Sequence, residues 1–311
     1  MARVMTVTGA IGAEALGHCQ LHEHLFVSRG PATDAFPALL IDDEARSTAE
    51  LARYRAAGGD ALLDAQPGGA GRNAQALRRM SAASCVKIIA VTGFHLPMFY
   101  RADSFFFQAD EDALYERFAR ELNEGIQDEP GSEKVRAGAV KAALGAKGCA
   151  GRTAVLLRAA ARAAAAHKGV PLILHTDRGA GAPEALTLCA ACGLPERRVV
   201  VCHADRQAGD RAPHEAIARA GAMLGYDTIG RFKYHGDAAE LTLIRHMIGL
   251  GYAGRLLLSL DTTRERLSSY GGSIGLTYLL ETFLPLLRAG GIRAEDIDLM
   301  TTGNARRLFE A

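Results

Sequence analysis

The chain has 311 residues, of which 49% are hydrophobic, so it can bury a large core and is not disordered as a whole. Its 36 Lys and Arg residues balance 35 Asp and Glu residues, and the formal net charge is +1. Because no block of like charges occurs, the composition argues against a protein that binds nucleic acid or a membrane surface. We expect a small molecule as the partner.

The sequence predicts a cytoplasmic protein, because it shows neither a signal peptide nor an apolar run of about eighteen residues. Six cysteines are too few for a disulfide scaffold in a chain of this length. Cys189 and Cys192 form a CxxC within an Ala/Leu-rich stretch, where core packing is favoured and a redox or zinc site is the alternative. No linker interrupts the chain, which predicts one domain over residues 1–311.

Short apolar segments alternate with longer amphipathic segments along the chain. Eight short segments are typical of buried strands: 18–26, 61–65, 86–92, 136–143, 170–176, 198–203, 222–227 and 255–261. The intervening segments predict helices at 43–57, 72–83, 111–126, 152–167, 181–193, 237–250 and 276–288. This alternation predicts an α/β fold.

Repeated strand–helix units with nearly continuous apolar strands indicate a parallel sheet that closes into a (β/α)8 TIM barrel. An open, doubly wound sheet is the alternative. The first strand–helix turn lacks GxGxxG, and the Gly-rich segment 66–73 fits neither the dinucleotide nor the P-loop pattern, which argues against nucleotide binding.

Histidines and a carboxylate follow the apolar runs of several predicted strands. His22 and His24 form a His-x-His pair, whose period of two points both side chains toward the barrel axis. His175, His203 and Asp261 each end another strand. Since these ends meet at the C-terminal mouth of a barrel, the pattern predicts a divalent transition-metal site there. Coincidental core and rim histidines are the alternative.

Lys141 lies in the apolar segment AGAVKAAL at the end of the fourth predicted strand. Burial there would lower the pKa of the amine and favour its neutral form. A neutral amine beside metal ions can add carbon dioxide to give a carbamate, which offers two oxygens to bridge two metals. The alternative is a lysine whose amine reaches the barrel mouth or pairs with a carboxylate.

The chain resembles the phosphotriesterase-like family of the amidohydrolase superfamily over nearly its whole length. The stretches that carry the resemblance are LHEHL at 21–25, GAGRN at 69–73, VTGFH at 91–95, AGAVK at 137–141, LILHT at 172–176, VVCHAD at 200–205, GYDTIG at 225–230, LLLSLD at 256–261 and GNARRLF at 303–309. The chain departs from the family at Asn304-Ala305, where Asn-Pro is usual, and at Phe94-His95, where many members carry an aromatic. The second departure bears on the substrate.

The resemblance implies two divalent transition-metal ions, zinc above all, although Mn, Co, Ni or Fe accept the same ligands. The implied ligands are His22, His24 and Asp261 on one metal, His175 and His203 on the other, and carboxylated Lys141 between them. A hydroxide bridging the metals is the expected nucleophile. Asp261 is the expected catalytic proton acceptor, with Asp205 or Asp227 either relaying protons or serving as helix caps and rim carboxylates.

Cations follow the strand ends on several loops, which favours an anionic substrate. They are Arg178, Arg206, Arg231, Lys233, Arg264 and Arg266. The stretches TGFHLPMFY and GRFKYHGD are similar to those of the members that open phosphorylated sugar lactones. We therefore expect a lactonase whose substrate contacts include Lys233, Arg264, His95 and Arg178.

Other functions use the same metal ligands. Amide hydrolysis of N-acyl amino acids and phosphotriesterase or acyl-homoserine lactonase activity differ only in the substrate pocket. A metal-bound barrel without catalysis is the alternative from another class, and a proton acceptor such as Asp261 argues against it. The resemblance also favours a homodimer.

Overall fold

The computed structural model describes residues 2–128 and 131–311. Eight parallel strands form one sheet in the order β10-β9-β8-β7-β6-β5-β4-β3, so each strand pairs with its sequence neighbour. Their bounds are β3 (Cys19–Glu23), β4 (Ala61–Asp64), β5 (Lys87–Gly93), β6 (Ala139–Ala143), β7 (Leu172–His175), β8 (Val199–Cys202), β9 (Met223–Tyr226) and β10 (Leu256–Leu258). Each overlaps a segment predicted as a strand.

The barrel nearly closes between its first and last strands. Just beyond β10, the Asp261 N–H donates to the His22 carbonyl at 3.1 Å, and the His22 N–H donates to Ser259 Oγ at 3.2 Å. These bonds join the two ends of the sheet and place the C-terminal end of β10 beside β3. The predicted (β/α)8 TIM barrel is confirmed, and the open sheet is wrong.

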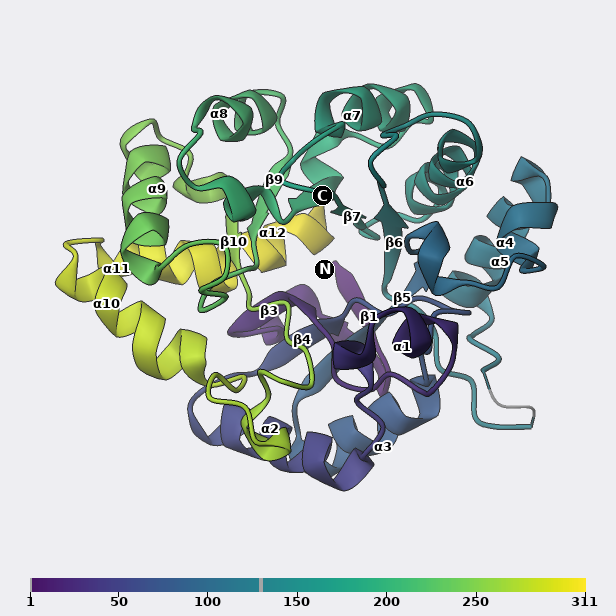
Figure 1. Ribbon diagram of the computed structural model, residues 1–311, viewed down its shortest axis with the longest axis horizontal. Coiled ribbons are helices and arrows are strands. Elements are labelled where there is room, and N and C mark those ends of the chain that lie inside the picture. Colours follow the sequence, from purple (N-terminus) through teal and green to yellow (C-terminus); the bar gives the residue numbers. More distant parts are fainter. Residues whose placement is uncertain (1, 129–130) are drawn as a thin grey trace.

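Helices surround the sheet in a ring (Figure 1). The longer ones are α2 (Glu44–Ala56), α3 (Ala74–Ser84), α5 (Glu111–Asn123), α6 (Arg152–Ala166), α7 (Ala182–Ala191), α8 (Ala212–Arg219) and α9 (Asp237–Gly249). The shorter ones are α1 (Pro31–Ala35), α4 (Phe105–Gln108), α10 (Leu284–Ala289), α11 (Ala294–Asp298) and α12 (Asn304–Glu310). Side chains of Asp43, Asn73 and Asp110 accept a backbone N–H at the starts of α2, α3 and α5, which explains why those helices begin there.

The segment predicted as a helix at 276–288 is not one continuous α-helix. A π-helical turn at Leu279–Phe283 precedes α10. Pro285 lies in the first turn of α10 and has no N–H to donate, so the regular hydrogen-bond ladder is interrupted at this point. The sequence pattern also did not predict α8, α12 or the hairpin of β1 (Arg3–Thr6) and β2 (Gly9–Gly12).

The N-terminal end of the barrel interior is filled by apolar side chains. Residues of the strands pack there with the β1 hairpin and α12, including Leu21, Ile89, Ile173, Leu308 and Phe309, all at most 2% exposed. The Val7 N–H also donates to the Ile88 carbonyl at 2.8 Å, which ties the hairpin to β5. This end is a packed core, so within the barrel interior a functional site is expected at the opposite, C-terminal mouth.

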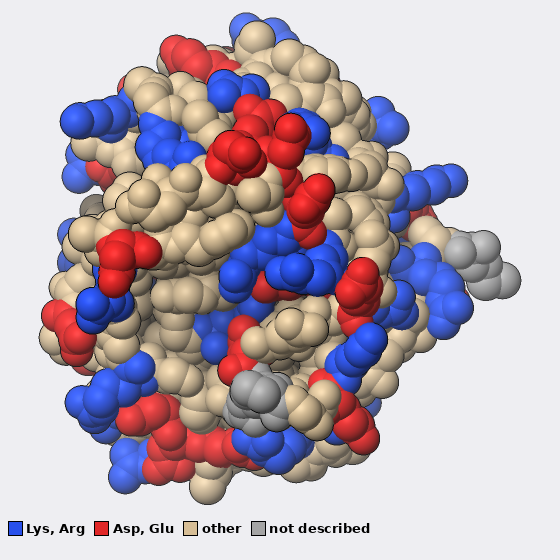
Figure 2. Space-filling view, turned by 90° about the vertical axis from the view of Figure 1, so that its right-hand side faces the viewer, with Lys and Arg blue, Asp and Glu red and all other residues tan. Residues whose placement is uncertain are grey.

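Among the described residues, no helix is long and apolar enough to cross a membrane. Positive and negative side chains lie beside one another over much of the face drawn in Figure 2. That distribution agrees with the formal net charge of +1.

Candidate metal centre

The predicted ligands come from three strands and from the residues just after β3, β8 and β10, and they meet at the C-terminal mouth. His22 belongs to β3, Lys141 to β6 and His175 to β7, while His203 directly follows β8. Asp261 lies three residues beyond the end of β10. The parallel sheet explains this convergence, because all its strands run toward the same mouth.

An irregularity in β3 turns the His-x-His pair inward. The pairing of β3 with β4 shifts register between Gln20 and Glu23. Cys19 and Leu21 belong to the apolar interior cluster, whereas His22 and His24 line the cavity at the mouth. The inward positions therefore change from odd to even along this strand, as expected for a bulge-like shift.

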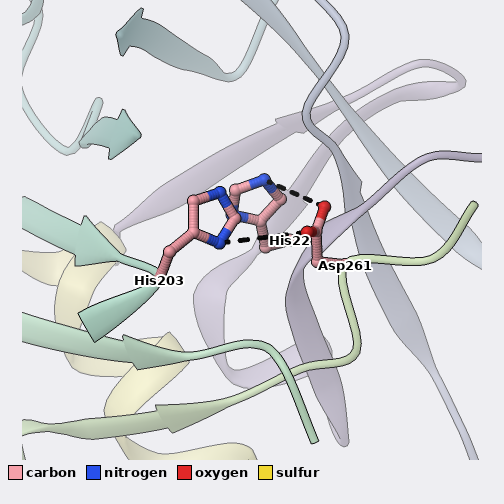
Figure 3. Close-up of side chains that lie close together, drawn as sticks. All are labelled: His22, His203 and Asp261. Carbon is pink, nitrogen blue, oxygen red and sulfur yellow. Dashed lines mark ion pairs between the residues drawn. The ribbon is translucent and has the colours of Figure 1, made fainter. Parts of the chain in front are cut away.

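His22, His203 and Asp261 form the centre of the cluster, and their donor atoms all lie within 4.8 Å of one another. Figure 3 shows the two imidazoles side by side, with the carboxylate of Asp261 facing both. Asp261 Oδ1 lies 3.9 Å from His22 Nε2 and 3.4 Å from His24 Nε2. His175 Nδ1 lies 2.8 Å from His203 Nε2, which places the fourth predicted imidazole in the same cluster.

Lys141 is fully buried, and its Nζ lies 3.1 Å from His22 Nε2. The β5 backbone approaches the lysine closely, because the Phe94 N–H donates to the Lys141 carbonyl at 3.0 Å. At Gly93, whose φ is 103°, an added Cβ would overlap that carbonyl, so glycine is required there. Burial lowers the pKa of the Lys141 amine, which favours the neutral form.

Asp227, at the end of β9, contacts two of the imidazoles from behind. Its Oδ1 lies 2.7 Å from His203 Nδ1, and its Oδ2 lies 2.8 Å from His22 Nδ1. The Oδ1 also accepts the His203 N–H at 3.0 Å. Burial and then the nearby Asp261 carboxylate raise the pKa of Asp227 to about 7. Asp227 therefore orients two ligand candidates, a role typical of the residues behind a metal site.

Asp261 is held by cations and by a strained backbone. Its φ is 49°, in the left-handed region. Arg231 lies 2.8 Å and Arg206 lies 3.3 Å from its Oδ2, which leaves Oδ1 facing the histidines. Burial alone would raise the pKa of Asp261, but Arg231 and the surrounding imidazoles outweigh burial and hold the pKa well below its ordinary value. This side chain is a carboxylate.

Glu23 fixes the backbone on both sides of Asp261. Its carboxylate accepts the Leu260 N–H at 2.8 Å, the Thr262 N–H at 3.0 Å and the Thr262 hydroxyl at 2.7 Å. The sequence reasoning did not single out Glu23. Its position between the two histidines of LHEHL was the available signal, since the intervening residue of a strand points toward the neighbouring strand and helix layer.

The donor set fits divalent transition metals. Burial lowers the pKa values of His22, His175 and His203 well below the ordinary range, so their imidazoles are neutral and can ligate a cation. His22 Nε2 and His24 Nε2 face Asp261 Oδ1, and His22 Nδ1 lies on the far side of its ring, 2.8 Å from Asp227 Oδ2. Nitrogen and oxygen donors gathered in this way suit zinc and its neighbours, and a cation would compensate for their burial.

A cavity of about 260 Å³ opens over the cluster. Besides the histidines and Asp261, its wall includes His95, Lys233, Arg206, Arg231 and Tyr234. A second cavity of about 280 Å³ shares the side chains of Arg231 and Lys233 with the first and also contacts Arg266. Two of the four predicted substrate contacts, His95 and Lys233, therefore lie at the site.

The other two predicted contacts, Arg178 and Arg264, line neither cavity. Arg178 is exposed and has a φ of 57°. Arg264 donates to the Leu40 carbonyl at 2.9 Å and lies over the ring of Tyr270. Arg206 and Arg231 provide positive charge at the cavity instead, because their side chains turn inward to Asp261.

A model of the phosphotriesterase family matches residues 2–309. The chain belongs to the phosphotriesterase family. The resemblance seen in the sequence is therefore confirmed.

Relatives of this phosphotriesterase-family chain include a "Phospho-furanose lactonase" of Mycoplasmopsis agalactiae, 28% identical over 322 residues that cover 98% of this chain and 91% of that protein. An amidohydrolase from Mycoplasma synoviae has a TM-score of 0.93 at 25% identity, with 99% of this chain and 92% of that chain covered. The phosphotriesterase homology protein from Escherichia coli, solved with phosphate in its active site, has a TM-score of 0.87 at 26% identity. The match covers 95% of this chain and 99% of that chain. The chain is thus similar to hydrolases that include lactonases.

Proposed function

We propose that the protein is a metal-dependent lactonase that opens phosphorylated sugar lactones. The observation that carries this proposal is the position of Lys233 and Arg231. These two cations form a wall shared by the cavity over the histidine cluster and by the second, neighbouring cavity. A lactone carbonyl can lie over the cluster while its phosphate contacts the shared wall. The names of two relatives agree, one a phospho-furanose lactonase and the other bound to phosphate.

His22, His24 and Asp261 would hold one metal ion, and His175 and His203 a second, with a carbamate of Lys141 between them. Two divalent ions supply a hydrolytic nucleophile from water at neutral pH and polarise the carbonyl under attack. Zinc suits the donor set, and Mn, Co, Ni or Fe also accept it. The carbamate is supported by full burial of Lys141 and by the lowered pKa of its amine.

Asp261 is the proton acceptor in this proposal. Its Oδ1 faces the imidazoles, and its low pKa keeps it ionised. Arg206 and Arg231 fix Oδ2, so the carboxylate presents one oxygen to the reacting group. That oxygen receives the proton of the attacking water and returns it to the alkoxide that leaves when the ring opens.

Lys233 would bind the phosphate. Its side chain is exposed in the loop after β9, and its Nζ lies 5.0 Å from the centre of the Tyr234 ring. No described carboxylate forms an ion pair with Lys233. The ammonium is therefore available to an anion, and a charged hydrogen bond contributes about 1.5–3 kcal/mol.

The substrate test compares phosphorylated aldonolactones with their unphosphorylated counterparts. The phosphorylated lactones should have a kcat/KM higher by about ten-fold or more. Lys233→Ala should remove much of this preference and change the hydrolysis of neutral lactones little. Lys168→Ala, at an exposed lysine near the opposite end of the barrel, is the matched control. Equal rates on both lactones would contradict the phosphate assignment.

The same panel separates the alternatives. A clear preference for N-acyl amino acids would support the amidohydrolase function. A preference for phosphotriesters or acyl-homoserine lactones would support those activities and would mean that the substrate contacts apolar parts of the pocket and not the cationic wall. If metal-loaded protein hydrolyses no ester, amide or phosphotriester, the result would support the remaining alternative, a metal-bound barrel without catalysis.

The metal assignment is tested at Lys141. Lys141→Ala should empty or weaken the centre, whereas Lys141→Glu, which restores one carboxylate, should retain more metal. Elemental analysis of the loaded variants, together with His175→Ala and His203→Ala, measures this difference. A Lys141→Ala protein with the metal content and turnover of the parent would contradict the bridging role.

A further inference from the structure

A second buried cluster of metal-ligand side chains lies behind the loop that carries Arg231 and Lys233. Asp205 belongs to the 3-10 turn Ala204–Gln207 after β8, His235 lies in the loop before α9, and Glu240 lies near the start of α9. One donor atom from each of these three residues lies within 4.8 Å of the other two. Asp205 and Glu240 are 0% exposed. None of the three is a predicted ligand of the centre at the mouth.

The polar atoms of this cluster lack hydrogen-bond partners. Both carboxylate oxygens of Glu240, Asp205 Oδ1 and His235 Nε2 are buried without a partner among the residues the structure describes. The imidazole Nε2 and Glu240 Oε2 lie 3.1 Å apart, but not in the geometry of a hydrogen bond. Four buried polar atoms without hydrogen bonds are costly unless something lies between them.

One tautomer of His235 presents a lone pair to the two carboxyl groups. Its Nδ1 lies 3.4 Å from the Gly236 carbonyl oxygen, which can only accept a hydrogen bond. In the neutral tautomer that satisfies this contact, Nδ1 carries the hydrogen and Nε2 carries the lone pair. A histidine whose remote nitrogen donates to a backbone carbonyl is the usual arrangement at a metal site.

A bound cation would also reduce the electrostatic repulsion within the cluster. The Asp205 and Glu240 carboxyl groups are both fully buried and lie close together, so they repel one another when both are ionised. A divalent ion would compensate both carboxylates at once. One imidazole and two carboxylates suit Zn²⁺ or Mn²⁺, whereas Ca²⁺ and Mg²⁺ prefer oxygen ligands alone.

We propose that Asp205, His235 and Glu240 form a structural binding site for a divalent transition-metal ion, separate from the centre at the mouth. Zinc–nitrogen and zinc–oxygen bonds are about 2.0–2.2 Å long, so tetrahedral ligand atoms lie about 3.3 Å apart. The three donors lie within 4.8 Å of one another, which is near this spacing. The ion would join the turn after β8 to the start of α9.

The site would hold the loop of residues 228–236 in place. Asp205 Oδ2 already accepts the Thr228 N–H at 2.6 Å at the start of this loop, and His235 lies near its end. Arg231 and Lys233, the cations of the cavity wall, lie between these two anchors. On the proposed function, a metal ion bound to Asp205 and His235 therefore fixes both ends of the segment that carries the substrate-binding cations.

Crystals of the full chain loaded with Zn²⁺ test the site directly. We expect an anomalous peak among Asp205, His235 and Glu240, in addition to any density at the mouth. The Glu240→Gln protein should lack this peak and retain the density at the mouth. A loaded parent protein without a peak at the triad overturns the proposal, whether or not the mouth binds metal.

Solution measurements use two variants, so that poor folding of one does not decide the outcome. Zn²⁺ or Mn²⁺ binding, measured by equilibrium dialysis and elemental analysis, should fall by one equivalent in Glu240→Gln and in His235→Asn. The control is His246→Asn on the same helix, where His246 pairs with Glu215 at 2.7 Å. Metal content in both variants equal to that of the parent and the control overturns the proposal.

Discussion

The two ends of the barrel interior are built from the same strands but contain side chains of opposite character. On β6, Ala139 packs in the apolar cluster, and Lys141 follows two residues later at the mouth. On β7, Ile173 and His175 repeat this arrangement. The N-terminal end derives its stability from close packing. The mouth instead concentrates buried polar groups, some without partners, which favours binding and chemistry over stability.

The largest effect should come from the carboxylate at the mouth. Asp261→Asn removes the proposed proton acceptor and should lower kcat by about 10²–10⁴-fold. Steady-state hydrolysis of the preferred lactone measures this. Asp298→Asn, at an exposed carboxylate of α11, should retain the parent rate. An Asp261→Asn enzyme with nearly full kcat would remove Asp261 from the proton transfer.

A change at the opposite end of the interior should affect stability and leave the chemistry intact. Ile89→Ala in β5 opens a cavity in the apolar cluster and should lower the free energy of unfolding by about 2–5 kcal/mol. Ile89→Val should cost only about 0.5–1.5 kcal/mol. Denaturant unfolding measures both, and kcat should stay unchanged below the unfolding transition. A large loss of kcat in folded Ile89→Ala would show that the two ends are not independent.

Glu23 lies behind the mouth and should give an intermediate effect. Glu23→Gln loses an acceptor for the bonds that bracket Asp261, so activity or metal affinity should fall by about 10–100-fold. Metal titration and kcat together measure the change. Glu14→Gln, at an exposed glutamate, is the control. Unchanged values in Glu23→Gln would mean that the loop after β10 holds Asp261 without this carboxylate.

Replacing Lys141 should give the smallest effect, and its sign on the free energy of unfolding should be opposite to that of Ile89→Ala. In metal-free protein, Lys141→Met replaces a buried amine by an apolar chain of similar length and should raise the free energy of unfolding by about 1–3 kcal/mol. When both proteins are first loaded with metal, a chelator should destabilise the parent but not the variant. Lys168→Met, at an exposed lysine, should change stability by less than about 0.5 kcal/mol. A metal-free Lys141→Met less stable than the parent would indicate that the amine has a favourable partner at the mouth.

Local patterns in the sequence determined the strands, most helices and the positions of the metal-ligand candidates. Buried strands of a parallel sheet are apolar along their length, so a polar residue such as His175 or Asp261 directly after an apolar run marks the mouth. The closed barrel then brings the C-terminal ends of the strands together, whatever the conformation of the loops. For that reason the cluster could be predicted from one chain.

Only the tertiary structure decided which way individual side chains point. The period of two predicted that His22 and His24 point inward together, but the register shift in β3 that lets Cys19 and Leu21 face the interior as well is visible only in the structure. Loop cations were indistinguishable in sequence, yet Arg231 turns to Asp261 whereas Arg264 contacts Leu40 and Tyr270. The Asp205, His235 and Glu240 cluster likewise joins three segments that share no pattern. Side-chain direction in loops depends on backbone conformation and on partners distant in sequence, and local residue patterns do not encode either.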